Sequence, residues 1–110
     1  MSVNAPFTPT GNTVTITAAN PAPTPVQVNG NNGWSNQYRI LNSGTNIAFL
    51  GFGSNAAVAT AGATAPGTGL ANCIPLLPGT DEIITFQGGA FFTANASVST
   101  TLYVTPGDGS

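Results

Sequence analysis

A chain of 110 residues is long enough for one domain around a single hydrophobic core. Its charge is unusually low: one arginine and three acidic residues make up 4% of the chain, where an ordinary domain carries about 25% charged residues. Without lysine there is almost nothing to neutralise phosphates, which excludes nucleic-acid binding through the sugar–phosphate backbone. So small a net charge favours self-association or docking onto a larger body.

The residue types that perform catalysis are also scarce. The chain has no histidine, which excludes Ser-His-Asp and Cys-His arrangements, and its one cysteine, Cys73, excludes an internal disulfide and a cysteine-based zinc site. Asp81 and Glu82 are neighbours on a predicted strand, so their side chains point to opposite faces and cannot act together on one bond. We therefore predict a protein that is not an enzyme, holds no metal or cofactor, and keeps Cys73 as a buried, inert thiol.

The start of the chain predicts an extended arm. Residues 1–12 contain two prolines, with Val3 and Phe7 as the larger apolar groups, and such segments often pack on a neighbouring molecule. The first residues lack the basic and apolar stretches of a signal peptide, and no apolar run approaches the roughly 18 residues of a membrane-spanning helix. We therefore expect either synthesis in a cytoplasm or a mature form of the protein, and no membrane partner.

Two strands and a connection are expected next. Residues 13–17 alternate strictly, with Val14 and Ile16 on one face and threonines on the other, which predicts a half-buried strand. Three prolines within residues 20–25 predict an extended connection, and residues 26–28 a short second strand.

The densest apolar segment of the chain lies in its middle. Residues 36–42 and 45–52 predict two strands, joined as a hairpin by the turn at Ser43-Gly44. Both faces of this pair carry apolar groups, which implies cover on both sides. The second cover could be a packed sheet, another subunit, or the long loop at residues 53–72, in which residues 56–59 could make a helical turn.

The second half of the chain predicts the remaining strands, at residues 70–77, 82–86, 90–98 and 99–105. Pro78-Gly79 has the signature of a type II turn, and residues 87–89 predict a hairpin-like loop. About eight short strands with such turns between them are typical of an antiparallel sandwich or barrel. We predict an all-β fold, an antiparallel β-sandwich of about eight strands that resembles a jelly roll, with an arm at 1–12, one domain at 13–106 and a tail at 107–110.

Trp34 and Tyr38 stand among asparagine and glutamine residues, and an aromatic surface beside amides is one way to hold a sugar ring. The other interpretation is that Trp34 anchors a loop to the core or to a neighbour through its indole N–H. Arg39 is the only cation, and we expect it to pair with one of the carboxylates.

Four segments carry a family pattern: YRILNSGT at 38–45, FLGFG at 49–53, IPLLPGTDE at 74–82 and LYVTPGDG at 102–109. Together they resemble the capsid cement, or decoration, proteins of short-tailed bacteriophages. The resemblance specifies a fold better than an activity, and it provides no catalytic residues. It implies a jelly-roll-like domain that binds outside the assembled shell and bridges neighbouring subunits, often as a dimer or trimer at a symmetry axis.

The leading hypothesis is therefore a virion structural protein on the capsid exterior that staples neighbouring major capsid protein subunits and associates with itself. Val3, Phe7 and Trp34 are the predicted contact residues, because they lie in Pro-, Gly- and Asn-rich segments. The alternative is a carbohydrate-binding or receptor-binding module of a phage fibre or tail, motivated by Trp34 and Tyr38.

Overall fold

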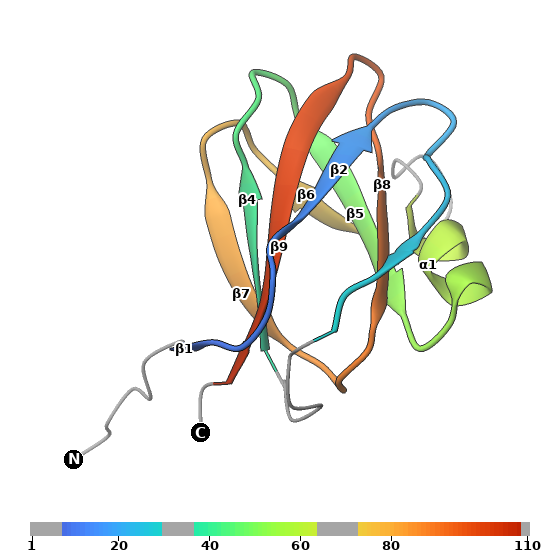
Figure 1. Ribbon diagram of the computed structural model, residues 1–110. Helices are drawn as coiled ribbons and strands as arrows, with labels where there is room; N and C mark the ends of the chain where they lie inside the picture. Colours follow the sequence, from blue (N-terminus) through green and yellow to red (C-terminus); the bar gives the residue numbers. More distant parts are fainter. Residues whose placement is uncertain (1–7, 30–36, 64–72, 109–110) are drawn as a thin grey trace.

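The computed structural model describes residues 8–29, 37–63 and 73–108, which form two stacked β-sheets with one helix beside them (Figure 1). The elements in chain order are β1 (Thr8–Pro9), β2 (Val14–Ala18), β3 (Val26–Gln27), β4 (Gln37–Asn42), β5 (Ala48–Gly53), α1 (Ala56–Gly62), β6 (Ile74–Leu76), β7 (Asp81–Thr85), β8 (Phe91–Asn95) and β9 (Thr100–Asp108). The first sheet has the order β1-β9-β4-β7, with β2 also beside β9, and the second has the order β3-β8-β5-β6. All the pairings within the two sheets are antiparallel.

The pairings are nested from the ends of the chain toward its middle. β2 pairs with β9, β3 with β8, β4 with β7, and β5 with β6. The first half of the chain thus pairs with the second half in reverse order, as if one long hairpin had been rolled into two sheets. This is the jelly-roll arrangement, and it confirms the predicted antiparallel sandwich.

The predicted hairpin in the middle of the chain is wrong. β4 lies in the first sheet and β5 in the second, so the turn between them carries the chain across the sandwich. The same correction applies to β7 and β8, which also lie in different sheets. Turn residues show where the chain reverses, but the strands here face each other across the core, where Ile40 and Leu50 are both fully buried.

The core follows the alternation of the strands. On β9, Leu102 and Val104 are buried while Tyr103 is exposed, as predicted. The last strand nevertheless runs on to Asp108, beyond the predicted end at residue 105, because its final residues pair with β1 and β4. The larger core side chains come from both sheets: Ile16, Tyr38, Ile40, Leu102 and Val104 from the first, and Leu50, Leu76 and Phe92 from the second.

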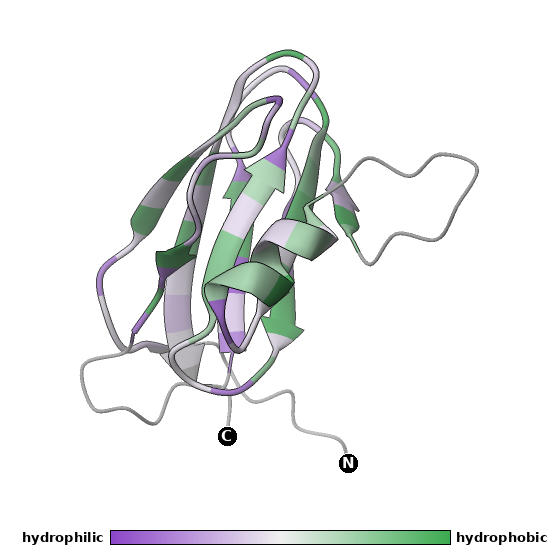
Figure 2. Cartoon of the chain, turned by 90° about the vertical axis from the view of Figure 1, so that its right-hand side faces the viewer, coloured by the Kyte–Doolittle hydropathy of each residue, from purple (hydrophilic) through white to green (hydrophobic). Residues whose placement is uncertain are grey.

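Helix α1 covers the outer face of the second sheet, as Figure 2 shows. The helix begins after Asn55, whose side-chain oxygen accepts a hydrogen bond from Val58 N at 3.0 Å. It can lie so close because β5 has glycines beneath it: a Cβ on Gly51 would clash with backbone atoms of the helix, and one on Gly53 with the Val58 side chain. The segment after residue 53 therefore supplies one of the covers that the sequence predicts.

A buried amide, Asn42, connects three parts of the chain at one end of the sandwich. Its Nδ2 donates to Asn46 O at 2.8 Å and to Leu76 O at 3.0 Å. Its Oδ1 accepts from Gly44 N at 3.1 Å and from Thr100 Oγ1 at 2.8 Å. Asn42 is fully buried, and all its side-chain donors and acceptors are used.

The turn before β7 is held by the same residue. Gly79 N donates to the Asn42 carbonyl at 2.8 Å, and Thr80 N donates to Leu77 O at 3.2 Å. Gly79 has φ +75°, which agrees with the predicted type II turn with Pro78 at its second position.

Replacing Asn42 by aspartate preserves the shape but removes both N–H donors. The new carboxylate faces the Asn46 and Leu76 carbonyls, so we expect a loss of about 3 kcal/mol in the free energy of unfolding at neutral pH. Burial raises the pKa of the new carboxyl, so the loss is smallest below the ordinary aspartate pKa of about 3.9 and grows as the pH rises through the folded-state pKa. Urea unfolding at acidic and neutral pH measures both effects. Asn46→Asp is the control, because it removes only an exposed hydrogen bond to Ser99 O; an equal loss in the two variants would contradict the assigned role of Asn42.

Replacing Gly51 by alanine tests the seat of the helix. The added methyl group meets Ala59 O and Ala63 N, which are backbone atoms, so α1 must shift away from β5. We expect a loss of about 1–3 kcal/mol in the free energy of unfolding. Ala57→Ser is the matched control on the exposed side of the helix, and we expect it to change stability by less than about 0.5 kcal/mol. Wild-type stability of Gly51→Ala in thermal and urea unfolding would show that the helix does not need this glycine.

Candidate interaction surface

The outer face of the first sheet carries hydroxyl and apolar side chains in rows across β2, β9, β4 and β7. The register places Thr15 beside Tyr103, Tyr103 beside Leu41, and Leu41 beside Asp81. The side chains that point outward from this face are Thr15, Thr17, Gln37, Arg39, Leu41, Asp81, Ile83, Thr85, Thr101, Tyr103 and Thr105. We call this set the outer face. Within the described ranges α1 packs only on the other sheet, so no helix covers these side chains.

One ion pair supplies the charge on the outer face. The Arg39 guanidinium donates to Asp81 Oδ2 through Nη2 at 2.6 Å and through Nε at 3.1 Å, which confirms the expected pairing of the only cation. The two side chains are 50% and 47% exposed, so the pair contributes at most about 1 kcal/mol to stability. Its main consequence is that neither charge is free to attract a charged partner.

Two of the larger apolar side chains on the outer face are exposed. Ile83 is 51% exposed and Tyr103 is 37% exposed. Leu41, beside Tyr103, is half-buried, and Arg39 lies beside Ile83. Hydroxyl groups frame them, and two of these, Thr13 Oγ1 and Thr105 Oγ1, bond to each other at 2.7 Å. A surface of this kind can form contacts through apolar burial and backbone hydrogen bonds, with little contribution from charge.

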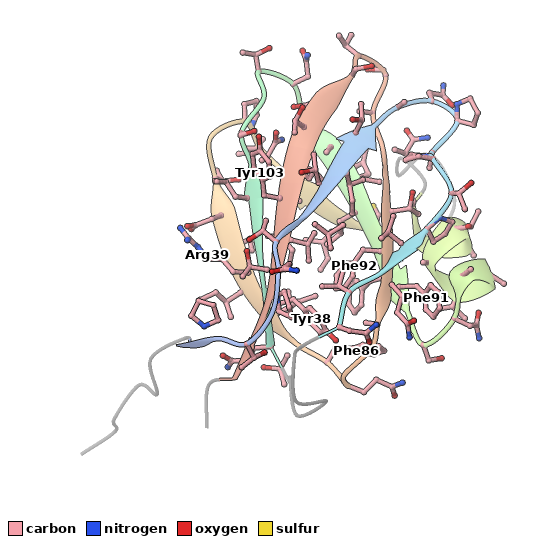
Figure 3. All side chains as sticks on the ribbon, in the orientation of Figure 1. Tyr38, Arg39, Phe86, Phe91, Phe92 and Tyr103 are labelled. Atoms are coloured by element: carbon pink, nitrogen blue, oxygen red, sulfur yellow. The ribbon has the colours of Figure 1, made fainter. Side chains whose placement is uncertain are left out.

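Tyr38 is predicted from the sequence to share an aromatic surface with Trp34, and for Tyr38 this prediction is wrong. It lies on the inner face of β4 and is fully buried, with its ring 4.8 Å from the ring of Phe92 (Figure 3). Its hydroxyl donates to Gln87 O at 2.6 Å and accepts from Ala90 N at 3.2 Å. Tyr38 therefore fixes the connection between β7 and β8.

The Tyr38 ring belongs to a row of aromatic rings between the two sheets. Phe92 stacks on Phe52 at a centroid distance of 5.8 Å, and Phe52 meets Phe86 edge-on at 5.2 Å. Such contacts stabilise a core beyond the area that they bury. The aromatic side chains of this region thus serve packing.

The predicted contact residues Val3, Phe7 and Trp34 lie outside the described residues, so their positions are not tested. Cys73 is free and half-buried, less buried than the sequence predicts. On the outer face, the exposure of Ile83 is not predicted by the sequence. Its signal is weak, because the DEIIT stretch has two adjacent isoleucines and so does not show which of them faces outward, nor that this strand lies at the edge of a sheet.

Other classes of site find little support in the described part of the chain. Across residues 8–29, 37–63 and 73–108 no three His, Cys, Asp or Glu side chains gather as metal ligands, and no pocket is formed. The same residues contain no helix that is both long and apolar enough to cross a membrane. No protein-family model, curated protein or solved structure matches the chain.

Replacing Tyr38 by phenylalanine tests its part in the core. The variant leaves Gln87 O and Ala90 N without their partner, so we expect a loss of about 1–3 kcal/mol in the free energy of unfolding at neutral pH.

The pH dependence of stability provides a second test of Tyr38. Burial raises the pKa of the Tyr38 phenol, and the hydrogen bond from Ala90 N opposes this rise only in part. A raised folded-state pKa stabilises the protein fully below the unfolded-state pKa of about 10, and this contribution is lost as the pH rises through the folded-state value. Urea unfolding at alkaline pH should therefore show a fall in stability that Tyr38→Phe lacks and that Tyr103→Phe, on the outer face, retains. The same alkaline fall in all three proteins would contradict this assignment.

Proposed function

We propose that this protein is a structural component of a bacteriophage head that binds outside the assembled shell and bridges neighbouring subunits of the major capsid protein. It acts as a scaffold for contacts and performs no catalysis. Its place is the exterior of the virion, after synthesis in the cytoplasm of the host.

The fold supports this proposal by analogy. Eight-stranded jelly rolls occur in viral capsid proteins, and also in lectins and cupins, so the fold alone does not decide between functions. The segments that resemble cement proteins correspond to β4, β5, β9 and the stretch from β6 into β7. Of these, β4, β5 and β9 lie inside their sheets, whereas β6 and β7 are edge strands.

The observation that carries the proposal is the composition of the outer face. Its one cation is paired with Asp81, and its remaining groups are hydroxyls, apolar side chains and the amide of Gln37. A protein that is added in many copies can bind through such a surface without repulsion between copies. Val3, Phe7 and Trp34 remain the proposed contacts with the capsid protein, and self-association as a dimer or trimer is part of the proposal.

The carbohydrate-binding alternative loses one of its two aromatic residues, because Tyr38 is buried in the core. Trp34 alone cannot build the paired surface on which that reading rested. Carbohydrate binding is therefore not proposed here, and a titration with host polysaccharide tests it alongside shell binding.

Binding to phage shells assembled without this protein tests the proposal. We expect the purified protein to sediment with such shells and to raise the temperature at which they break open, because it adds contacts between subunits. Phe7→Ala combined with Trp34→Ala should weaken binding, whereas Val98→Ala, which shortens an exposed apolar residue in the connection between β8 and β9, should not. No binding to shells, or binding to host polysaccharide in a parallel titration, would overturn the proposal.

A further inference from the structure

β7 is the last strand of the first sheet and forms the left margin of the molecule in Figure 1. At the end of β4, Asn42 N donates to Thr80 O, and its C=O accepts from Gly79 N. The backbone of Asn42 is therefore directed toward the β7 side of its strand. Because backbone directions alternate along a strand, the direction at Asn42 determines which residues of β4 and β7 face each other and which face away.

Hydrogen-bonded pairs alternate along an antiparallel ladder, so the backbone groups of Ile40 and Tyr38, like those of Asn42, also face β7. By the observed register, their partners in β7 are Glu82 and Ile84. The N–H and C=O groups of the residues between and beside them point away from the sheet and meet no other described strand. These residues are Asp81, Ile83 and Thr85.

The other sheet edges are less open to a further strand. β6 contains Pro75, β1 contains Pro9, and β3 directly follows the proline-rich residues 20–25. Proline removes a backbone donor and protects an edge against pairing. β2 has no proline, but the residue after it, Ala19, crosses to the second sheet, where it exchanges hydrogen bonds with β8 and the residue that follows it.

We propose that two copies of this chain pair through β7, antiparallel and centred on Ile83, so that their first sheets join into one continuous sheet. The free backbone groups are spaced symmetrically about Ile83, so this register satisfies all of them at once. Ile83 of each copy donates to and accepts from Ile83 of the other, and Asp81 does so with Thr85 of the other.

The charges of β7 agree with this register. Asp81 lies opposite Thr85 of the second copy, and Glu82 lies opposite Ile84, so no carboxylate faces a carboxylate across the pair. The exposed side chains of Ile83 from the two copies lie side by side on the joined outer face, where pairing removes apolar surface from water. A second copy of the chain is thus a partner whose charges and hydrogen-bonding groups match those of the edge.

The inference deepens the proposed function and rests on it for its biological meaning, because it names the surface through which a bridging dimer would form. Its test needs only the purified full-length protein. If the chain pairs through β7 but does not bind shells, the proposed function alone fails; if it binds shells as a monomer, the pairing alone fails.

Sedimentation velocity from about 1 μM to about 1 mM protein tests the pairing. The shared strand has five residues, so we expect a small interface and a weak dimer that forms as concentration rises. Ile83→Lys should weaken dimerisation by about tenfold or more, because it places two like charges side by side at the centre. Thr15→Lys is the matched control, because it adds the same charge to the outer face on β2 at the opposite edge of the sheet, and it should leave dimerisation unchanged.

Amide hydrogen exchange tests the register. Exchange at Ile83 and Thr85 should slow as the concentration rises, whereas exchange at Glu82 and Ile84, which already bond to β4, should not depend on concentration. A protein that stays monomeric over the whole range, an equal loss of dimer in Thr15→Lys and Ile83→Lys, or concentration-independent exchange at Ile83 would each overturn the proposal.

Discussion

The buried side chain of Asn42 is the constraint on which this small sandwich most depends. A jelly roll moves its chain from one sheet to the other at successive connections, and each crossing exposes backbone groups that no ladder satisfies. Asn42 supplies partners for two such connections and for the first residue of β9. Because the amide is fully buried, its bonds form in a medium of low dielectric, where each is stronger and each is more costly to lose.

Two side chains on the inner face of β4 form hydrogen bonds with connections at opposite ends of the sandwich. Tyr38 and Asn42 both point inward, with Ile40 packed in the core between them. The phenol of Tyr38 fixes the connection between β7 and β8, and the amide of Asn42 fixes the turns that flank β4 and β7 at the other end. A single central strand thus combines apolar burial with two polar anchors, which specifies where its neighbours begin and end.

Local features of the chain were predictable from the sequence. The alternation in β2 and β9, the turn at Gly79 and the pairing of Arg39 each depend on neighbouring residues or on the scarcity of charge. The partners of the strands were not predictable in the same way. A turn such as Ser43-Gly44 reverses the chain whether the next strand lies beside the first or across the core, and contacts distant in sequence decide between the two. One of these is the close approach of Gly44 to Thr100. The exposure of Ile83 was missed for the same reason, because a strand becomes an edge only when the whole topology is known.

The ion pair of Arg39 with Asp81 has a consequence for how the domain responds to dissolved salt. Electrolyte weakens attraction and repulsion between exposed charges, with a screening length of about 8 Å at physiological ionic strength. Here the only cation is paired with Asp81, and few other charges exist. A change in salt concentration therefore alters few of the interactions that stabilise the fold. Apolar burial and backbone hydrogen bonds persist at low and at high salt. A domain of this kind can pass between media of very different salinity without losing the interactions that hold it together.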